Sequence, residues 1–403
     1  MRAAATSNVD ARVIALGPNL PAIPERLLLA HARGEALFIA GAGISRSAGL
    51  PDFRQLVLDV YEKLDKPMYD VLSKIPSTAC NLWNADISGL TNQQSAEVKR
   101  FIGGDYDVVL GMLERRMDGQ SSPLSGVRQA IAENLRRPGL RPAPIHRSLM
   151  RLADRGGAVT IVTTNFEHLL EDAGAAIRSK VQTYALGGIP RPGRSTDFAG
   201  VLHIHGALDR DPARTADLIV SDQDFGEFYL RRRVVSDFIY DAARLFHLVL
   251  VGYSVNDPPM RYLLNAVAAD GARFDDLKER FTFVGNGGPD PVALEDWKGR
   301  GITPIHYDSA DKHSMLLQVL ERWAELSPVN GRRRLVDTEI KRIVRLSRSA
   351  ASDADRDLFD HLIRRSDPNE RVRLSTLASH ANADLTWLDA IADIASERDA
   401  ARR

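Results

Sequence analysis

The chain has 403 residues, of which 44% are hydrophobic and 26% charged, and its 53 Lys and Arg residues balance 53 Asp and Glu residues. This length predicts one large domain with a smaller attachment, and the neutral balance gives no electrostatic argument for a nucleic-acid partner. No apolar run approaches the ~20 residues that span a bilayer, and the amino terminus lacks the apolar core of a signal peptide. The single cysteine, Cys80, excludes an internal disulfide and a multi-cysteine zinc site. We therefore expect a cytoplasmic protein with no zinc and no other metal site.

Short apolar runs, each bounded by turn residues or amphipathic segments, are typical of buried parallel strands. Helical patterns lie between them, for example over residues 146–153, 167–173 and 315–323. This alternation predicts an α/β fold with a doubly wound, Rossmann-like parallel sheet. The predicted strands are residues 36–40, 158–163, 201–204, 245–251, 281–284 and 302–305.

The gap between the first two predicted strands is too long for one crossover helix. Residues 56–144 are therefore predicted to be a helical insertion within a main domain of residues 1–330, and residues 106–117 have helical spacing. Residues 331–403 are predicted to be a small helical appendage for assembly or partner contact. The basic stretch 331–348 is interpreted as a solvated helix face, so direct nucleic-acid contact is not expected.

A glycine turn, Gly41-Ala42-Gly43, follows the first predicted strand, and a helix is predicted to start at Ser45. Backbone N–H groups of such a turn can approach a pyrophosphate. The dehydrogenase fingerprint would need a third glycine where Arg46 stands, and the sequence contains no GxxxxGK[ST] phosphate loop. Taken alone, the turn fits a plain tight turn as well as a dinucleotide site.

Polar residues follow three later strands as well. They are Thr164-Asn165-Phe166-Glu167, His203-Ile204-His205-Gly206 and Gly252-Tyr253-Ser254. Ligands of doubly wound folds bind at the carboxyl ends of the strands, so we expect these residues to meet there. Alternation along the strand predicts that both histidines lie on one face, and His203 is interpreted as a structural side chain.

Taken together, these motifs resemble the sirtuin (silent information regulator) family over roughly residues 30–325. The resemblance rests on residues 41–45, 49–54, 164–167, 205–206 and 252–254. It implies an NAD+ site in which Asn165 acts at the nicotinamide ribose and His205 is the catalytic base. Further NAD+-binding residues by this resemblance are Gly41, Ala42, Gly43, Ile44, Ser45, Asp52, Phe53, Arg54, Thr164, Glu167, Gly252, Ser254 and Asn286.

The chemistry of these residue types agrees with those roles. Asn165 can hold a water molecule or a ribose hydroxyl without adding charge, and an unperturbed His205 would titrate near neutrality. Phe53 would shield the reacting face from solvent. Arg54 would contact a phosphate or order its loop, or else pair with Asp52 as a structural element.

Two departures from the sirtuin deacylases change the expected reaction. Their four-cysteine zinc domain is missing here, with the helical insertion in its place, and Glu167 stands where they have Asp. The zinc-free pattern resembles instead bacterial sirtuin-like domains of antiphage defence. This implies an NAD+ glycohydrolase that releases nicotinamide and ADP-ribose and depletes NAD+ during abortive infection. Two alternatives remain open: an NAD-dependent protein deacylase or ADP-ribosyltransferase, and a non-catalytic module that senses NAD or ADP-ribose.

An enzyme that destroys NAD+ must be restrained. The resemblance implies a homo-oligomer or a regulatory partner, either a HerA-type ATPase or an Argonaute-like protein. The arginines at positions 231–233 and the stretch 331–348 are candidate contact surfaces. The sequence is also compatible with a chain that forms the front part of a longer polypeptide.

Overall fold

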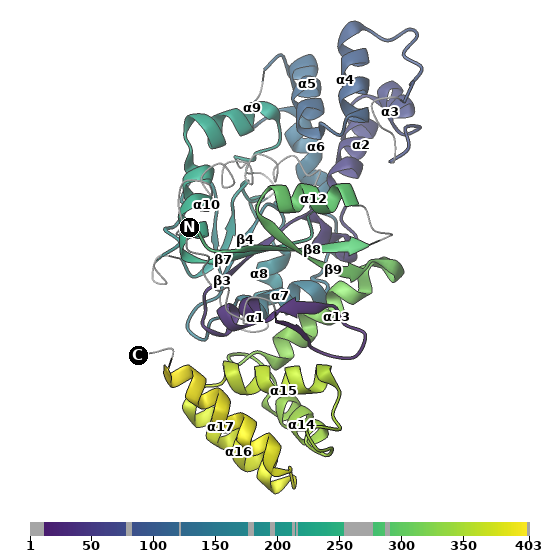
Figure 1. The fold of residues 1–403 in the computed structure, drawn as a ribbon. Coiled ribbons are helices and arrows are strands. Elements are labelled where there is room, and N and C mark those ends of the chain that lie inside the picture. The colour runs from purple at the N-terminus through teal and green to yellow at the C-terminus, as the bar shows by residue number, and fades with distance from the viewer. Residues whose placement is uncertain are drawn as a thin grey trace, which may run out of the picture.

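A seven-stranded sheet forms the centre of the fold (Figure 1). The computed structural model describes residues 12–77, 83–120, 122–175, 181–193, 198–211, 214, 217–253, 277–286 and 291–400. Its strands lie in the order β5-β6-β4-β3-β7-β8-β9, and all neighbouring pairs are parallel. They are β3 (Ala36–Ala40), β4 (Thr160–Thr163), β5 (Gln182–Tyr184), β6 (Gly200–His203), β7 (His247–Val251), β8 (Arg280–Asn286) and β9 (Ile302–Asp308).

The predicted α/β fold with a doubly wound parallel sheet is confirmed, and each predicted strand overlaps an observed one. Sequence patterns missed β5. This edge strand has three residues, and its Gln182 and Thr183 are exposed, so it lacks the apolar run that marks a buried strand.

Both faces of the sheet are covered, because alternate side chains of each strand enter different apolar cores. Phe38 packs into a core with helices α1 (Glu25–Ala32), α7 (Pro144–Ala153), α8 (Leu169–Gly174) and α13 (Ala310–Leu326). Leu37 and Ile39 pack into the opposite core with α10 (Val234–Leu245) and α12 (Pro291–Gly299). Figure 1 shows α1, α7 and α13 on one side of the sheet and α10 and α12 on the other.

The glycine turn leads into a short 3₁₀-helix (Ala42–Ala48), so the prediction of a helix start at Ser45 is wrong. This helix ends at Gly49, whose left-handed φ of 90° suits glycine. Pro51 follows, and α2 (Phe53–Leu64) begins only after Asp52, whose side chain accepts a hydrogen bond from the Gln55 backbone N–H. The polar turn and the α-helix are therefore separate elements.

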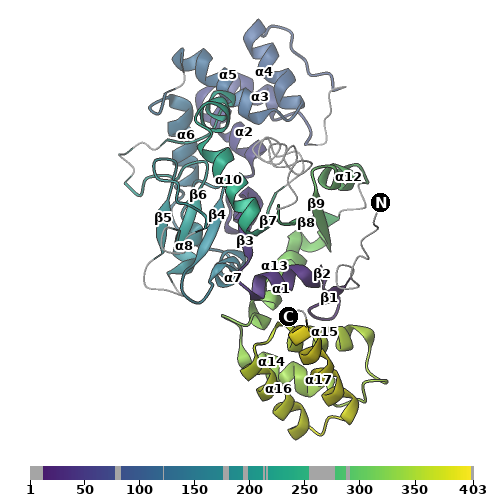
Figure 2. The same cartoon turned by 60° about the vertical axis from the view of Figure 1, so that its left-hand side comes forward.

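Of the α-helices that the structure describes between β3 and β4, the five that precede α7 share an apolar cluster with Leu169 and Leu218 from later segments. Figures 1 and 2 show them at the opposite end of the molecule from the C-terminal helices. They are α2, α3 (Lys66–Leu72), α4 (Asn92–Ile102), α5 (Tyr106–Asp118) and α6 (Gly126–Leu135).

The C-terminal helices pack against the main domain rather than standing apart (Figure 2). Buried Glu25 of α1 pairs with Arg364 at 2.6 Å and contacts His361 at 3.3 Å. Helix α15 also packs on β1 (Val13–Ala15), which pairs antiparallel with β2 (Ala22–Pro24). Neither these helices nor any other helix of the described residues is long and apolar enough to cross a membrane. The C-terminal helices of this paragraph are α14 (Arg333–Ile343), α15 (Asp353–Arg365), α16 (Pro368–His380) and α17 (Leu385–Ala400).

Candidate functional site

The sheet has its topological switch point between β3 and β7, where the chain leaves neighbouring strands in opposite directions. The glycine turns after these two strands touch, and the Gly43 N–H donates to the Gly252 carbonyl at 3.0 Å. A Cβ atom at Gly43 would lie 2.7 Å from that carbonyl oxygen, and one at Gly41 would lie 2.7 Å from the Tyr253 ring. Glycine is thus required by contact between the two turns, and this requirement would exist without any bound phosphate.

A cavity of about 630 Å³, including its opening to solvent, lies beside this point. Five segments supply the wall: the chain from Ala42 to Leu56, Leu135 at the end of α6 (Gly126–Leu135), the residues after β4, His205 after β6, and the region of Ile219 and Phe225. The predicted site residues that line it are Ala42, Ser45, Asp52, Phe53, Thr164, Asn165, Glu167 and His205.

Other predicted binding residues lie outside this wall. Ile44 is buried in the core below the cavity, while Gly41, Gly43 and Gly252 lie at the contact between the turns. Asn286 ends β8, but its side chain lies outside the described residues, as does the whole of Ser254.

Arg54 is not among the residues that line the cavity, and its predicted pairing with Asp52 is not observed between these two described residues. Its guanidinium donates to the Ile75 carbonyl at 2.5 Å and lies 5.0 Å from the centre of the Phe101 ring. Asp52 has Arg46 as its ion-pair partner, at 3.9 Å. Arg54 therefore ties the start of α2 to two other parts of the insertion, Ile75 after α3 and Phe101 on α4.

Asn165 is held by a buried polar network. Its Nδ2 group donates to Glu167 Oε1 at 3.1 Å, to Ser45 Oγ at 3.0 Å and to the Gly41 carbonyl at 3.3 Å. The Ser45 hydroxyl donates to the same Glu167 oxygen at 2.5 Å. Burial raises the pKa of Glu167, while the hydrogen bonds from Ser45 and Asn165 oppose that shift. The amide is oriented by its nitrogen, so its oxygen Oδ1 is the atom left for a ligand.

His146 completes this network, and sequence analysis gave it no role. Its Nδ1 accepts the Ala143 backbone N–H at 3.2 Å, which places the ring proton on Nε2, 3.3 Å from Ser45 Oγ. Burial lowers the pKa of His146 to about 4, so the ring is neutral near pH 7. Its position on α7, about a hundred residues from Ser45 in sequence, left no local signal to find it.

His205 is fully enclosed, and this changes its predicted proton chemistry. Its Nε2 lies 2.6 Å from the Tyr229 hydroxyl, and its ring packs edge-on against Phe225. Burial lowers the pKa of His205 to about 3, well below the near-neutral value of an unperturbed imidazole. The imidazole is neutral at any cellular pH. Tyr229 lies on a π-helix (Gly226–Arg231), an irregular element that often marks functional sites.

The two histidines near the end of β6 do not share a face as alternation predicted. The strand ends at His203, so the period of two does not extend to His205. His203 lies beside Asn165 and Glu171, with Nδ1 2.7 Å from the Asn165 carbonyl and Nε2 2.9 Å from Glu171 Oε1. Burial opposes ionisation of Glu171, but hydrogen bonds from His168, His203 and Thr183 hold its pKa well below the usual range.

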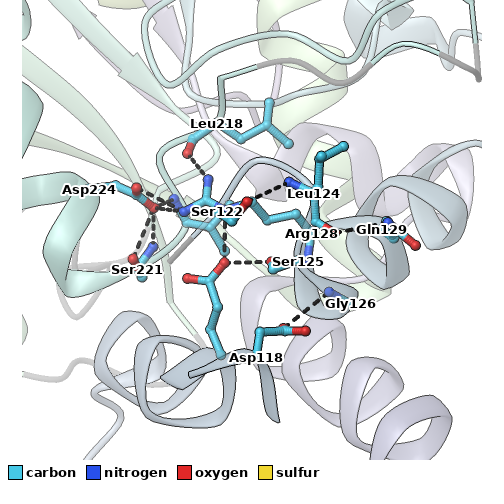
Figure 3. A network of polar contacts seen from close by, with 12 residues as sticks. Asp118, Ser122, Leu124, Ser125, Gly126, Arg128, Gln129, Leu218, Ser221 and Asp224 are labelled. Carbon is cyan, nitrogen blue, oxygen red and sulfur yellow. Dashed lines mark hydrogen bonds and ion pairs between the residues drawn. The ribbon is translucent and has the colours of Figure 1, made fainter. Parts of the chain in front are cut away.

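A buried arginine joins the helical insertion to the wall of the cavity (Figure 3). Arg128 of α6 donates to Asp224 at 2.7 Å, to Glu114 at 3.0 Å and to the Leu218 carbonyl at 2.5 Å. Asp224 also accepts the backbone N–H groups of Val220 and Ser221 at 2.9 Å. This network fixes residues 218–224, a segment that contains Ile219 and leads into Phe225, both of which line the cavity.

Part of this fold matches a known protein family. Residues 159–305, from β4 into β9, match the SIR2-like domain family. The predicted sirtuin resemblance is therefore confirmed at the level of a SIR2-like domain over this segment.

Individual relatives add the following similarities. The uncharacterized protein y4cA of Sinorhizobium fredii is 31% identical over 373 residues, covering 87% of this chain and 28% of that protein. The chain thus spans little more than a quarter of the relative's length. A structure described as the basis for the mechanism and regulation of Sir2 enzymes aligns with 14% identity and a TM-score of 0.34, over 74% of this chain and 96% of the other. A mutant Sir2 homologue in complex with ADP-ribose aligns with 15% identity and a TM-score of 0.35, over 78% and 98%.

Proposed function

We propose that the chain is an NAD+ glycohydrolase, which converts NAD+ and water into nicotinamide, ADP-ribose and a proton. The observation that carries this proposal is that Asn165 and His205, from the ends of two different strands, line one cavity at the carboxyl edge of the sheet. The SIR2-like match supports a nicotinamide dinucleotide as the substrate. Phosphates would lie toward the glycine turns, and the nicotinamide ribose would lie toward Asn165.

Three polar side chains of the cavity have tasks in this reaction. Cleavage of the nicotinamide–ribose bond sends its electron pair to the pyridine nitrogen and builds positive charge at the ribose. Asn165 Oδ1 would orient the attacking water, and the neighbouring Glu167 would stabilise the positive charge when ionised. As the water oxygen bonds to the ribose carbon, neutral His205 would accept the released proton, and its low pKa would favour release of that proton to water in the cavity. The walls formed by Phe53 and Phe225 would limit the entry of other water molecules.

The experiment is incubation of the purified full chain with NAD+, followed by chromatography of nicotinamide and ADP-ribose. Asn165→Ala and His205→Ala should each lower the rate at least about 100-fold, the lower end of a typical acid–base contribution. Exposed Asn92 and His380 provide matched controls, and Asn92→Ala and His380→Ala should retain the wild-type rate.

Other outcomes identify a different function. Binding of NAD+ by calorimetry without nicotinamide release would favour a sensing module. Nicotinamide release that requires an acetylated peptide, with loss of the acetyl group in mass spectrometry, would favour a deacylase. Full turnover by Asn165→Ala and His205→Ala would contradict the assignment of the site.

The resemblance to antiphage domains supports a biological role as an NAD+-depleting defence effector. In this proposal residues 1–330 are the hydrolase domain, with residues 56–144 inserted, and residues 331–403 serve assembly. A homo-oligomer, a HerA-type ATPase or an Argonaute-like protein would restrain the activity. Cellular NAD+ measured after phage infection, in strains carrying the wild-type chain or Asn165→Ala, tests this role: only the wild type should lose NAD+.

A further inference from the structure

Two histidines and a glutamate, from the start of α8 and the end of β6, converge next to the Asn165 loop. His168 precedes α8, Glu171 lies on its first turn, and His203 ends β6. One nitrogen or oxygen atom of each lies within 4.8 Å of the others. The side chains of Glu171 and His203 are 3% and 0% exposed, whereas His168 is 15% exposed and gives the cluster a route to solvent.

The outer hydrogen bonds of the two imidazoles fix where their ring protons lie. His203 Nδ1 is 2.7 Å from the Asn165 carbonyl, and His168 Nε2 is 2.6 Å from the Leu208 carbonyl. Because a carbonyl can only accept, each of these nitrogens carries a proton. In a neutral ring the other nitrogen then presents a lone pair. Both lone pairs point at Glu171 Oε1, at 2.9 Å from His203 Nε2 and 3.4 Å from His168 Nδ1.

Lone pairs that face one another in a buried place need positive charge between them. A second proton on each ring, which would then donate to Glu171, supplies that charge, and so does a bound cation. A ring N–H donated to a backbone carbonyl is the usual way in which a metal-binding histidine is oriented. The second carboxylate oxygen, Glu171 Oε2, is buried with no hydrogen-bond partner among the described residues. It is therefore available as an additional ligand.

We propose that His168 Nδ1, His203 Nε2 and the Glu171 carboxylate bind a divalent transition-metal cation, with Zn²⁺ as the ion that this ligand set suits. Bonds of about 2.0–2.2 Å in a tetrahedron place ligand atoms about 3.3–3.6 Å apart. The separation of 3.4 Å between His168 Nδ1 and Glu171 Oε1 lies within that range, and the separation of 2.9 Å between His203 Nε2 and Glu171 Oε1 would have to lengthen on binding. The Thr183 hydroxyl, which donates to Glu171 Oε1 at 2.7 Å, would hold the carboxylate in place.

The site would act on the cavity through the backbone. His203 holds the carbonyl of Asn165, so a bound cation would fix the loop that carries Asn165 and Glu167. This is a bracing role, because the ligands do not line the cavity. The cysteine count excludes a zinc site made of several cysteines and does not bear on a site made of histidine and carboxylate.

Zinc content tests the proposal independently of any NAD+ turnover. The full chain is stripped with a chelator, dialysed against micromolar Zn²⁺ and measured by plasma mass spectrometry; one tightly bound zinc per chain is expected. His168→Ala should weaken zinc binding at least roughly 10- to 100-fold, the loss caused even by removing an outer partner of a ligand. His380→Ala, at an exposed position on α16, should bind zinc as the wild type does.

A second measurement separates loss of the ligand from loss of the fold. Circular dichroism of each zinc-free variant checks folding, and Zn²⁺ should raise the melting temperature of the wild type and of His380→Ala but not of His168→Ala. If His168→Ala is unfolded, Glu171→Gln is used in its place, because glutamine keeps the shape of the side chain. Zn²⁺ should then leave the melting temperature of Glu171→Gln unchanged. A wild-type chain that binds no zinc under these conditions, or a folded ligand variant that binds it with unchanged affinity, overturns the proposal and leaves a cluster held by protons alone.

Discussion

Replacement of Arg128 by methionine tests whether the insertion is anchored to the cavity wall by one buried cation. The Arg128 side chain is 7% exposed, and its partners Glu114 and Asp224 are 2% and 14% exposed. Burial opposes the charge, but the two carboxylates more than offset this effect and raise the pKa of Arg128. Methionine fills a similar volume but leaves both carboxylates without their cation.

The expected cost follows from that geometry. Removing one partner of a buried ion pair costs about 3–5 kcal/mol. Glu114 keeps the Ser125 hydroxyl and Asp224 keeps two backbone N–H groups, so the hydrogen bonds that remain prevent a larger loss. Arg128→Met should therefore lower the free energy of unfolding by about 3–5 kcal/mol, measured by urea denaturation followed by tryptophan fluorescence.

Arg115→Met is the matched control. Arg115 contacts Asp222 at 3.3 Å, and the two side chains are 35% and 33% exposed, so its loss should cost at most about 1 kcal/mol. Equal effects of the two substitutions would refute the reasoning that burial sets the difference.

Three further predictions concern protons and the glycine turn. Because the pKa of His205 is about 3, the kcat/KM of NAD+ hydrolysis should show no acid limb due to this group between pH 8 and 5; a limb near pH 6.5 that is absent from a His205 variant with residual activity would contradict the buried state. His146 has a folded pKa of about 4 against an ordinary 6.5, so the unfolded chain binds more protons between these values and stability should fall by about 3 kcal/mol from pH 7 to 4. Urea titrations of His146→Gln should lack that part of the pH dependence, and an unchanged slope would count against it. Gly43→Ala should lower the unfolding free energy by about 1–3 kcal/mol, because its Cβ meets the Gly252 carbonyl at 2.7 Å. Gly187→Ala, with no atom within 4 Å of its Cβ, should change stability by less than about 0.5 kcal/mol in the same assay, and a similar loss in both variants would reject the steric argument.

Local pattern was sufficient to predict six of the seven described strands of the central sheet. A buried parallel strand needs a short apolar run, and each run predicted from the sequence overlaps an observed strand, whereas the short polar edge strand β5 has no such run. Because neighbouring strands are parallel, their carboxyl ends lie at the same edge of the sheet. The polar residues that follow the strands could therefore be expected to meet there. Asn165 and His205 were found in this way.

Tertiary structure alone decided what those residues contact and how they titrate. His146 reaches Ser45 from α7, Tyr229 reaches His205 from a π-helix, and Arg128 reaches residues 218–224 from the insertion. No spacing rule connects such distant positions, because each contact depends on how whole elements pack. The same holds for the pKa of His205, since it is set by burial among side chains from other segments rather than by its neighbours in the chain. The sequence by itself therefore determined which residue types stand at the sheet edge, and packing determined their partners, their charge and the space left between them.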